Sequence, residues 1–122
     1  MKLKVLKHEF SVCKVRDYSQ INFDSEYTFT GKTDEENSLV CLTDHVPENV
    51  TERDDGWRAF RIQGVLDFSL IGILAGISKV LAEHKIGIFV ISTFNTDYVM
   101  VKKENDKKAL AILADAGYEI EE

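Results

Sequence analysis

The chain has 122 residues, of which 44% are hydrophobic and 30% are charged, and this mixture excludes an intrinsically disordered chain. The formal net charge of −6 opposes binding to nucleic acid, because a phosphate backbone repels an acidic protein at long range. No apolar run approaches the roughly 20 residues that a membrane helix needs, and the first residues do not have the pattern of a secretion signal. We therefore expect a cytoplasmic globular protein with neither nucleic acid nor a membrane as a partner.

The first half of the sequence predicts strands and turns. Alternation of apolar and polar residues predicts one long strand or a bent pair over residues 2–15, and two further strands over residues 26–32 and 38–46. Two acidic runs, KTDEEN and TERDDG, lie between apolar segments, and we interpret both as solvated loops.

The cysteines and histidines do not form a metal-binding pattern in the sequence. Cys13 and Cys41 each lie in an apolar run that predicts a strand, without CxxC spacing, and we interpret them as buried thiols. The histidines, His8, His45 and His84, are far apart along the chain. The sequence leaves open a site that brings them together in space, but it predicts neither a metal nor another cofactor.

The second half begins with a strand over residues 57–64 and continues with a helix within residues 65–87. The apolar side chains of this helix form one stripe at helical spacing. They are Leu70, Ile73, Leu74, Ile77 and Leu81. Asp67 or Ser69 can cap its N-terminus, and Gly87 stands just beyond its C-terminus, where helices often end.

Two short strands follow, over residues 88–91 and 98–101, and a polar turn joins them. Tight hairpins prefer Asn-Gly or Asp-Gly, which reach positive φ at low cost. This turn instead carries an aromatic side chain, an amide, hydroxyls and a carboxylate, with Phe94 and Asp97 among them. Its composition leaves two interpretations open, a plain connection and a ligand-binding turn.

A second helix is predicted over residues 106–116, with Asn105 as its N-cap and Gly117 as its C-terminal stop, before a last strand over residues 118–121. The resulting order is β-α-β-β-α-β, the split βαβ or ferredoxin-like arrangement. We expect the two helices to cover one face of an antiparallel sheet. We also expect the first and second strands of this unit to lie side by side.

Several protein classes share this topology, and the residues disfavour three of them. RNA-recognition modules need stacking aromatic and basic side chains on central strands, whereas the strand YVMVKK offers one tyrosine. Metal chaperones of this fold need paired cysteines, which are missing from the first loop of the unit. RIQGVLDF resembles the phosphate-binding loop of acylphosphatases, but Phe68 stands where an arginine is expected and Asp67 beside it would repel phosphate.

Residues 57–122 resemble the ACT domain, a regulatory ligand-binding module. Three segments carry the resemblance, namely FRIQG, LDFSLIGILAGISKVLAEHKIGIFVISTFNTDYVMV and LADAGYEI. The branch most similar to them includes the CASTOR-type arginine sensors and small bacterial tandem-ACT proteins. Residues 1–56 are similar to the shorter, helix-poor half that precedes the ACT domain in that branch. The resemblance implies an α+β protein, in which a ferredoxin-like βαββαβ unit over residues 57–122 packs with a degenerate, β-rich ACT-like half over residues 1–56.

The resemblance also implies a ligand site between two such modules, lined by Thr93, Phe94 and Asp97. Thr93 and Phe94 would offer backbone groups, and the Asp97 carboxylate would bind an amino or guanidinium group. The predicted helix N-terminus has backbone N–H groups without intrahelical partners and a positive dipole end, which suit an α-carboxylate. The candidate ligand-binding residues are therefore Phe68, Ser69, Leu70, Thr93, Phe94 and Asp97.

Each of these residues also has a purely structural interpretation. Asp97 would stabilise its own turn, Phe94 would pack in a core, and Ser69 would cap the helix in either case. Gly72 and Gly76 destabilise a helix by about 1 kcal/mol each relative to alanine, which indicates the close approach of another backbone, from the sheet or a partner rather than a ligand.

We expect a non-enzymatic, homodimeric regulatory protein that binds a small molecule, an amino acid, and acts on a separate protein partner. No nucleophile with an adjacent base, metal-ligand spacing or glycine-rich phosphate loop points to catalysis, so we assign no catalytic residue and no cofactor. The alternative is a protein–protein interaction and dimerisation module without a ligand. Its flat interface would consist of Ile71, Gly72, Ala75 and Gly76.

Overall fold

The computed structural model of the chain describes residues 1–63 and 71–122. These residues form two compact units. Unit 1 consists of Met1–Lys7 and Arg58–Glu122, and unit 2 consists of His8–Trp57. None of the helices in the described residues is long and apolar enough to cross a membrane.

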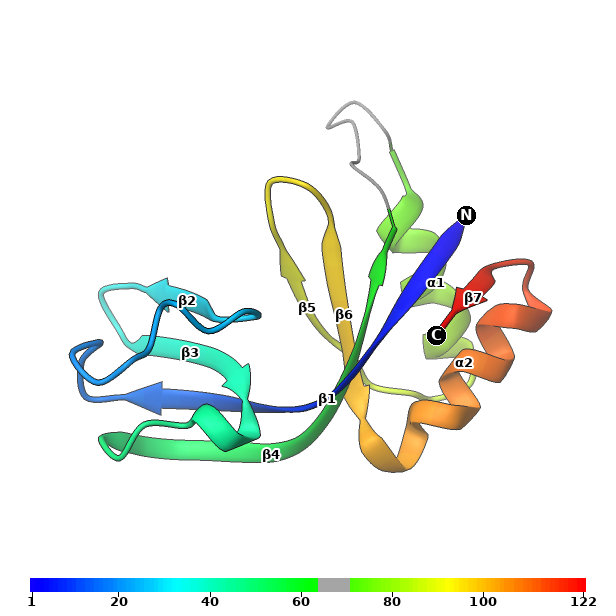
Figure 1. Cartoon of the computed structure of the whole chain (residues 1–122). Coiled ribbons are helices and arrows are strands. Elements are labelled where there is room, and N and C mark those ends of the chain that lie inside the picture. The colour runs from blue at the N-terminus through cyan, green and yellow to red at the C-terminus, as the bar shows by residue number, and fades with distance from the viewer. Residues whose placement is uncertain (64–70) are drawn as a thin grey trace. The chain divides into compact units, whose positions relative to one another are not determined.

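Unit 1 contains two α-helices packed on a β-sheet. Its described elements are part of β1 (Lys2–Val15), part of β4 (Val50–Ile62), α1 (Ile73–Glu83), β5 (Phe89–Ser92), β6 (Asp97–Lys102), the 3-10 helix Lys103–Asn105, α2 (Asp106–Asp115) and β7 (Glu119–Glu121). The strand order in this unit is β7-β1-β4-β6-β5. β1 and β4 continue from this unit into unit 2 (Figure 1).

The N-terminal residues of the chain form a strand of the unit 1 sheet. The start of β1 pairs in parallel with β7, with Leu3 opposite Ile120. The predicted β-α-β-β-α-β order is present as β4-α1-β5-β6-α2-β7, with β1 placed between β4 and β7. The expectation that the first and second strands lie side by side is wrong, because β6 lies between β4 and β5.

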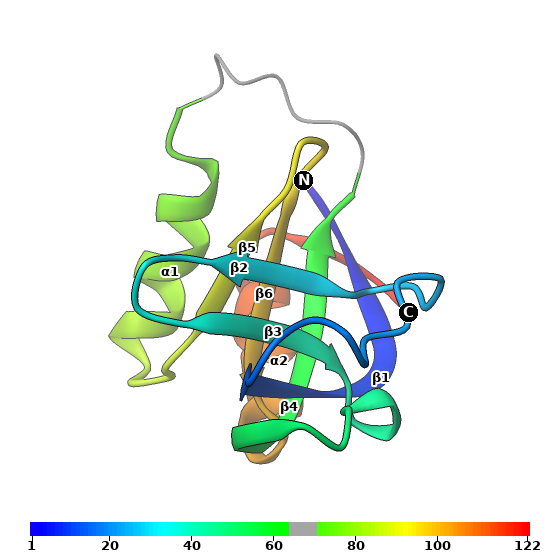
Figure 2. The same cartoon turned by 90° about the vertical axis from the view of Figure 1, so that its left-hand side faces the viewer.

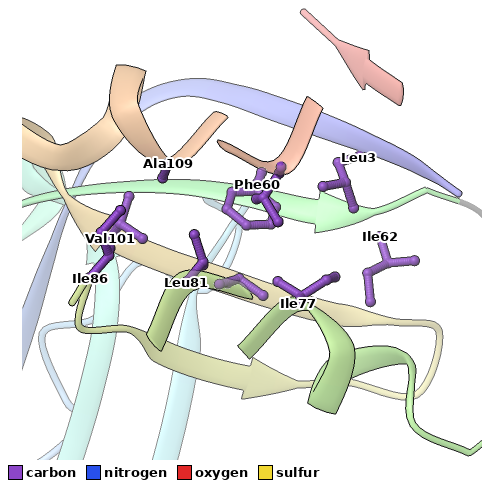
Figure 3. Packing of buried hydrophobic residues seen from close by; sticks show 10 residues of the cluster. Leu3, Phe60, Ile62, Ile77, Leu81, Ile86, Val101 and Ala109 are labelled. Atoms are coloured by element: carbon purple, nitrogen blue, oxygen red, sulfur yellow. The ribbon is translucent and has the colours of Figure 1, made fainter. Parts of the chain in front are cut away.

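The two helices cover one face of this sheet and enclose the core of unit 1 (Figure 3). Alternate strand positions point toward the helices, so Phe60 and Ile62 of β4 meet Ile77 and Leu81 of α1. Burial of each such large apolar side chain contributes roughly 1.5–3 kcal/mol. The fully buried members are Leu3, Phe60, Ile62, Ile77, Leu81, Val99, Val101, Ala109 and Leu113. The predicted apolar stripe of the first helix is confirmed for its described members.

The first helix begins later than the sequence predicts. α1 starts at Ile73, and Gly72 occupies its N-cap position with φ of +83° and no side-chain capping hydrogen bond. The predicted caps, Asp67 and Ser69, lie outside the described residues. The predicted start of the helix is therefore wrong, and Gly72 is a terminal residue of the helix rather than an interior one.

Both helices end in the same motif but with different residues at its left-handed position. After α1, Lys85 has φ of +60°, and the Ile86 N–H donates to the Leu81 carbonyl at 3.0 Å. This is the Schellman arrangement, in which the left-handed position is usually glycine. The predicted C-terminal glycine, Gly87, does not hold that position. After α2, the predicted Gly117 does, with φ of +104°.

Unit 2 is built from strands around a small core. Its described elements are β2 (Phe29–Lys32), β3 (Asn37–Leu42), the 3-10 helix Thr43–His45 and the parts of β1 and β4 within residues 8–57. The strand order is β2-β3-β1-β4, and Figure 2 shows β2 and β3 as a hairpin. Its buried cluster contains Cys13, Val15, Leu39 and Cys41.

The two acidic runs of the first half have different structures. Thr33–Glu36 of KTDEEN forms the β2–β3 turn, where the Thr33 hydroxyl accepts the backbone N–H groups of Glu35 and Glu36, so the loop prediction is confirmed there. TERDDG, in contrast, lies within β4, which begins at Val50. The loop interpretation of TERDDG is therefore wrong, because its backbone belongs to a strand. Its side chains are nevertheless exposed, and this exposure is why the run has the composition of a loop.

Candidate functional site

The structure divides the six candidate ligand-binding residues into two groups. Phe68, Ser69 and Leu70 lie outside the described residues. The other three, Thr93, Phe94 and Asp97, lie in unit 1, in and beside the turn that joins β5 to β6. The described part of the candidate site therefore consists of this turn and the start of α1.

Two threonines fix the β5–β6 turn. The strands end with Ser92 opposite Asp97. The backbone N–H and the hydroxyl of Thr93 both donate to the Thr96 carbonyl, each at 2.9 Å. Threonine hydroxyls commonly stabilise turns in this way, which explains how a tight turn forms without the usual glycine. The Thr93 N–H is thus used inside the turn, so the prediction that Thr93 offers a backbone group to a ligand does not rest on this N–H.

Thr96 anchors the turn to the end of β4. Its side chain is 6% exposed, and its hydroxyl donates to the Ile62 carbonyl at 2.7 Å. A buried polar group needs such a partner, because an unsatisfied one is destabilising. This bond brings the turn to the strand end that precedes residues 64–70. Thr96 is not among the predicted site residues, because its only signal in the sequence is a hydroxyl at the base of a turn.

Phe94 is at the tip of the turn, and its ring is 78% exposed. The interpretation of Phe94 as a core residue is therefore wrong. An exposed aromatic ring presents a large apolar surface that a ligand or a second protein can cover. Phe94 consequently keeps the exposure that a binding role requires.

Asp97 is half-buried, and it lies on the face of the sheet that the helices cover. Strand alternation places its side chain on the same face as Val99 and Val101, both of which belong to the core under the helices. The first residues of α1, Ile73 and Leu74, also pack against that core. Asp97 and the start of α1 therefore share one face of the unit 1 sheet.

The start of α1 is suited to an anionic group. The first intrahelical hydrogen bond runs from the Gly76 N–H to the Gly72 carbonyl at 2.9 Å. The N–H groups of the preceding first-turn residues have no intrahelical acceptor, as at every helix N-terminus. Gly72 supplies no capping side chain. The positive end of the helix dipole adds to the preference for a carboxylate.

A cationic side chain lies on the other face of β4 and was also missed by the sequence analysis. The Arg61 guanidinium lies 6.0 Å from the centre of the Tyr98 ring, and its Nη1 donates to the Tyr98 hydroxyl at 3.4 Å. Its Nε donates to Gln63 Oε1 at 3.2 Å. Because Tyr98 alternates with Asp97 along β6, Arg61 does not share the face of Asp97.

Only part of the predicted small-residue interface (Ile71, Gly72, Ala75 and Gly76) is free to contact another protein. Ile71 is 94% exposed. A Cβ atom at Gly76, however, would lie 3.2 Å from the Tyr118 hydroxyl, so Gly76 accommodates a side chain of the same unit. The predicted close approach of another backbone is not found among the described residues. Gly76 meets the Tyr118 side chain instead, and a Cβ atom at Gly72 would have no described neighbour within 4 Å.

Unit 2 contains the two cysteines, which are free thiols and buried, as predicted. A hydrogen bond from the Cys41 thiol lowers the pKa of Cys13, while burial opposes this shift. The same bond, together with burial, raises the pKa of Cys41. Among the described residues, no three His, Cys, Asp or Glu side chains are grouped as metal ligands require.

One family model matches the chain, and several solved structures share its fold. The model of the ACT domain family matches residues 52–115. A protein from Agobacterium tumefaciens is 33% identical, covers 98% of this chain and 90% of its own, and superimposes with a TM-score of 0.83. No curated protein matches the chain.

Two more distant structures share the fold. A Vibrio cholerae protein of unknown function, described as a possible transport protein, is 21% identical over 92% of this chain and 86% of its own, with a TM-score of 0.71. The regulatory subunit of aspartate kinase from Thermus thermophilus is 10% identical over 96% of this chain and 97% of its own, with a TM-score of 0.64.

Proposed function

The chain belongs to the ACT domain family, and we propose that it is a non-enzymatic regulatory protein that binds an amino acid. ACT domains are regulatory modules, and many of them bind amino acids. The fold shared with the regulatory subunit of an aspartate kinase agrees with a regulatory role. The proposal rests on the β5–β6 turn, which leads into Asp97 and is joined to the end of β4 by the bond from Thr96.

The proposed ligand lies between the start of the α1 segment and the β5–β6 turn. The carboxylate of Asp97 would bind the amino or guanidinium group of the ligand. The backbone N–H groups around the start of α1, with Phe68, Ser69 and Leu70 before it, would bind the α-carboxylate. Thr93 and Phe94 would line the site. The support is the face that Asp97 shares with the start of α1, and the bond from Thr96 that holds the turn in place.

The branch of the family, the division of the chain, its oligomeric state and its location are part of the same proposal. We place the chain in the tandem-ACT branch that includes the CASTOR-type arginine sensors, with a degenerate half over residues 1–56 and the ACT domain over residues 57–122. In that arrangement the ligand site forms at an interface between modules, and the chain forms a homodimer. The protein would act in the cytoplasm on a separate protein partner.

A thermal-shift screen of the twenty amino acids tests this proposal. A ligand that binds only the folded state, at 100 times its Kd, stabilises the protein by about 2.7 kcal/mol. We expect one amino acid at millimolar concentration to raise the Tm by several degrees. Asp97→Ala should remove this shift, and Asp34→Ala, which deletes an exposed carboxylate in the β2–β3 turn, should keep it. A folded protein whose Tm responds to none of the twenty contradicts the proposal.

A second candidate function is an interaction module without a ligand. The observation that favours it is the exposure of two large apolar side chains, Ile71 at 94% and Phe94 at 78%. This candidate predicts self-association or partner capture that Phe94→Ser weakens, in a protein whose Tm does not respond to amino acids. A monomer in sedimentation, combined with an amino-acid-dependent Tm, would exclude it.

A further inference from the structure

The last turns of α1 and α2 line a groove in unit 1, apart from the residues proposed to bind an amino acid. Its lining combines an apolar floor with an acidic rim, and it consists of Val80, Glu83, His84, Ile112, Asp115 and Ala116. The volume of the groove is about 290 Å³. This is at the lower limit of the roughly 300–1,000 Å³ of small-molecule pockets, and it suits one or two side chains better than an enclosed metabolite.

The floor of the groove is apolar and partly exposed. Val80 and Ile112 are half-buried, since one side of each packs against the core of unit 1. Ala116, the C-cap of α2, is exposed between them and the rim. An alkyl chain laid along these residues would remove apolar surface from water, at about 25 cal/mol per Å².

The rim of the groove is negatively charged. Glu83 and Asp115 are the last residues of α1 and α2, and both are exposed. Each helix also places the negative end of its dipole, roughly half an elementary charge, at this position. The His84 Nδ1 donates to the Val80 carbonyl at 3.0 Å, which fixes the imidazole beside the floor. Lys85, the cation that follows in sequence, does not line the groove.

We propose that this groove is a docking site for a basic segment of a partner protein, which inserts the aliphatic stem of a lysine or arginine between Val80 and Ile112. The charged end of that side chain would then bind Glu83 and Asp115. Lysine and arginine side chains combine an alkyl stem with a cation, and this combination matches an apolar floor with an acidic rim. The inference is independent of the proposed amino-acid site.

Other occupants fit the groove less well. A second copy of the chain, related by two-fold symmetry, would bring the same surface against itself and place Glu83 and Asp115 near their own counterparts. An anionic ligand would meet two carboxylates and two helix C-termini. Within the described residues, no group of three metal-ligating side chains occurs, so the two carboxylates do not form a metal site there.

An NMR titration tests the proposal with a defined probe. The ¹⁵N-labelled protein is titrated with the peptide acetyl-Ala-Leu-Lys-Ala-Leu-Lys-Ala-amide and with the same peptide carrying glutamine at both lysine positions. We expect the lysine peptide to shift the amide signals of the groove residues, with an affinity that falls as salt is added. The glutamine peptide should bind at least tenfold more weakly.

Two charge-matched variants locate the site. The double variant Glu83→Gln/Asp115→Asn should weaken binding of the lysine peptide by about tenfold, since two exposed ion pairs are lost. The control Glu35→Gln/Glu36→Gln removes the same net charge from the exposed β2–β3 turn and should leave the affinity unchanged. The proposal is overturned if no groove signal shifts, if the glutamine peptide binds as well as the lysine peptide, or if both variants weaken binding equally. All four substituted side chains are exposed, and circular dichroism checks that both variants are folded.

Discussion

The hydroxyl of Thr96 donates a 2.7 Å hydrogen bond to the backbone carbonyl of Ile62, and this bond joins the β5–β6 turn to the end of β4. Thr96 is 6% exposed, so the bond is made away from bulk water. The turn that carries Thr93, Phe94 and Asp97 thus has a defined place in unit 1.

Thr96→Val should lower the free energy of unfolding by about 1–2 kcal/mol, because it removes a buried hydrogen bond while keeping the shape of the side chain. Urea denaturation of both proteins measures the difference. Thr30→Val, an exposed position on β2, is the matched control and should change stability by less than about 0.5 kcal/mol. Equal losses in both variants would show that the bond to Ile62 has no stabilising role.

The left-handed positions after the two helices predict opposite effects of substitution. Lys85 has φ of +60°, where a side chain is strained, so Lys85→Gly should stabilise the protein by about 0.5–1 kcal/mol. Gly117 has φ of +104°, so Gly117→Ala should destabilise it by about 1 kcal/mol. Thermal unfolding followed by circular dichroism measures both. A destabilised Lys85→Gly protein would contradict this account of the end of α1.

The short distance between Gly76 and the Tyr118 hydroxyl predicts that substitutions at these two positions have coupled effects on stability. Gly76→Ala would gain up to about 1 kcal/mol of helix propensity, but its new Cβ would lie 3.2 Å from the Tyr118 hydroxyl. We expect little gain in the natural chain. In the Tyr118→Phe background the hydroxyl is absent, and the gain should approach about 1 kcal/mol. A double-mutant cycle measures the coupling, and additive effects would contradict the predicted contact.

The shifted pKa values of the two cysteines predict that the stability of the protein depends on pH. The hydrogen bond from Cys41 lowers the pKa of Cys13, so Cys41→Ala should raise that pKa. Thiolate absorbance followed against pH measures the shift. In the folded state the pKa of Cys41 is raised, so its contribution to stability is present below the ordinary thiol pKa and is lost as the pH rises above it. Cys41→Ala should therefore lose less stability at alkaline pH than the natural chain, and an equal loss would contradict the raised pKa.

Much of the helix-bearing unit could be predicted from local patterns. The apolar spacing of Ile73, Leu74 and Ile77 identified α1, and Asn105 and Gly117 marked the two ends of α2. These features depend on side chains close in sequence, which is why a single sequence shows them. The end of α1 could not be predicted, because Lys85 takes a position that usually selects glycine.

Features that depend on distant pairing could not be predicted. The pairing of Leu3 with Ile120 is set by the whole sheet, and no local pattern indicates it. The exposed run TERDDG has low strand propensity, yet its backbone belongs to β4. At the candidate site, the polar turn was recognised from its composition. The bond from Thr96 to Ile62 joins residues 34 positions apart, and only the fold brings them together.

Isothermal titration calorimetry of the purified chain with each of the twenty amino acids tests the central proposal most directly. We predict saturable heat for one amino acid at millimolar concentration or below, its loss in Asp97→Ala and its retention in Asp34→Ala. Circular dichroism must show that both variants are folded. The absence of binding heat for all twenty amino acids, with a folded natural chain, would contradict the proposal that this ACT domain protein binds an amino acid.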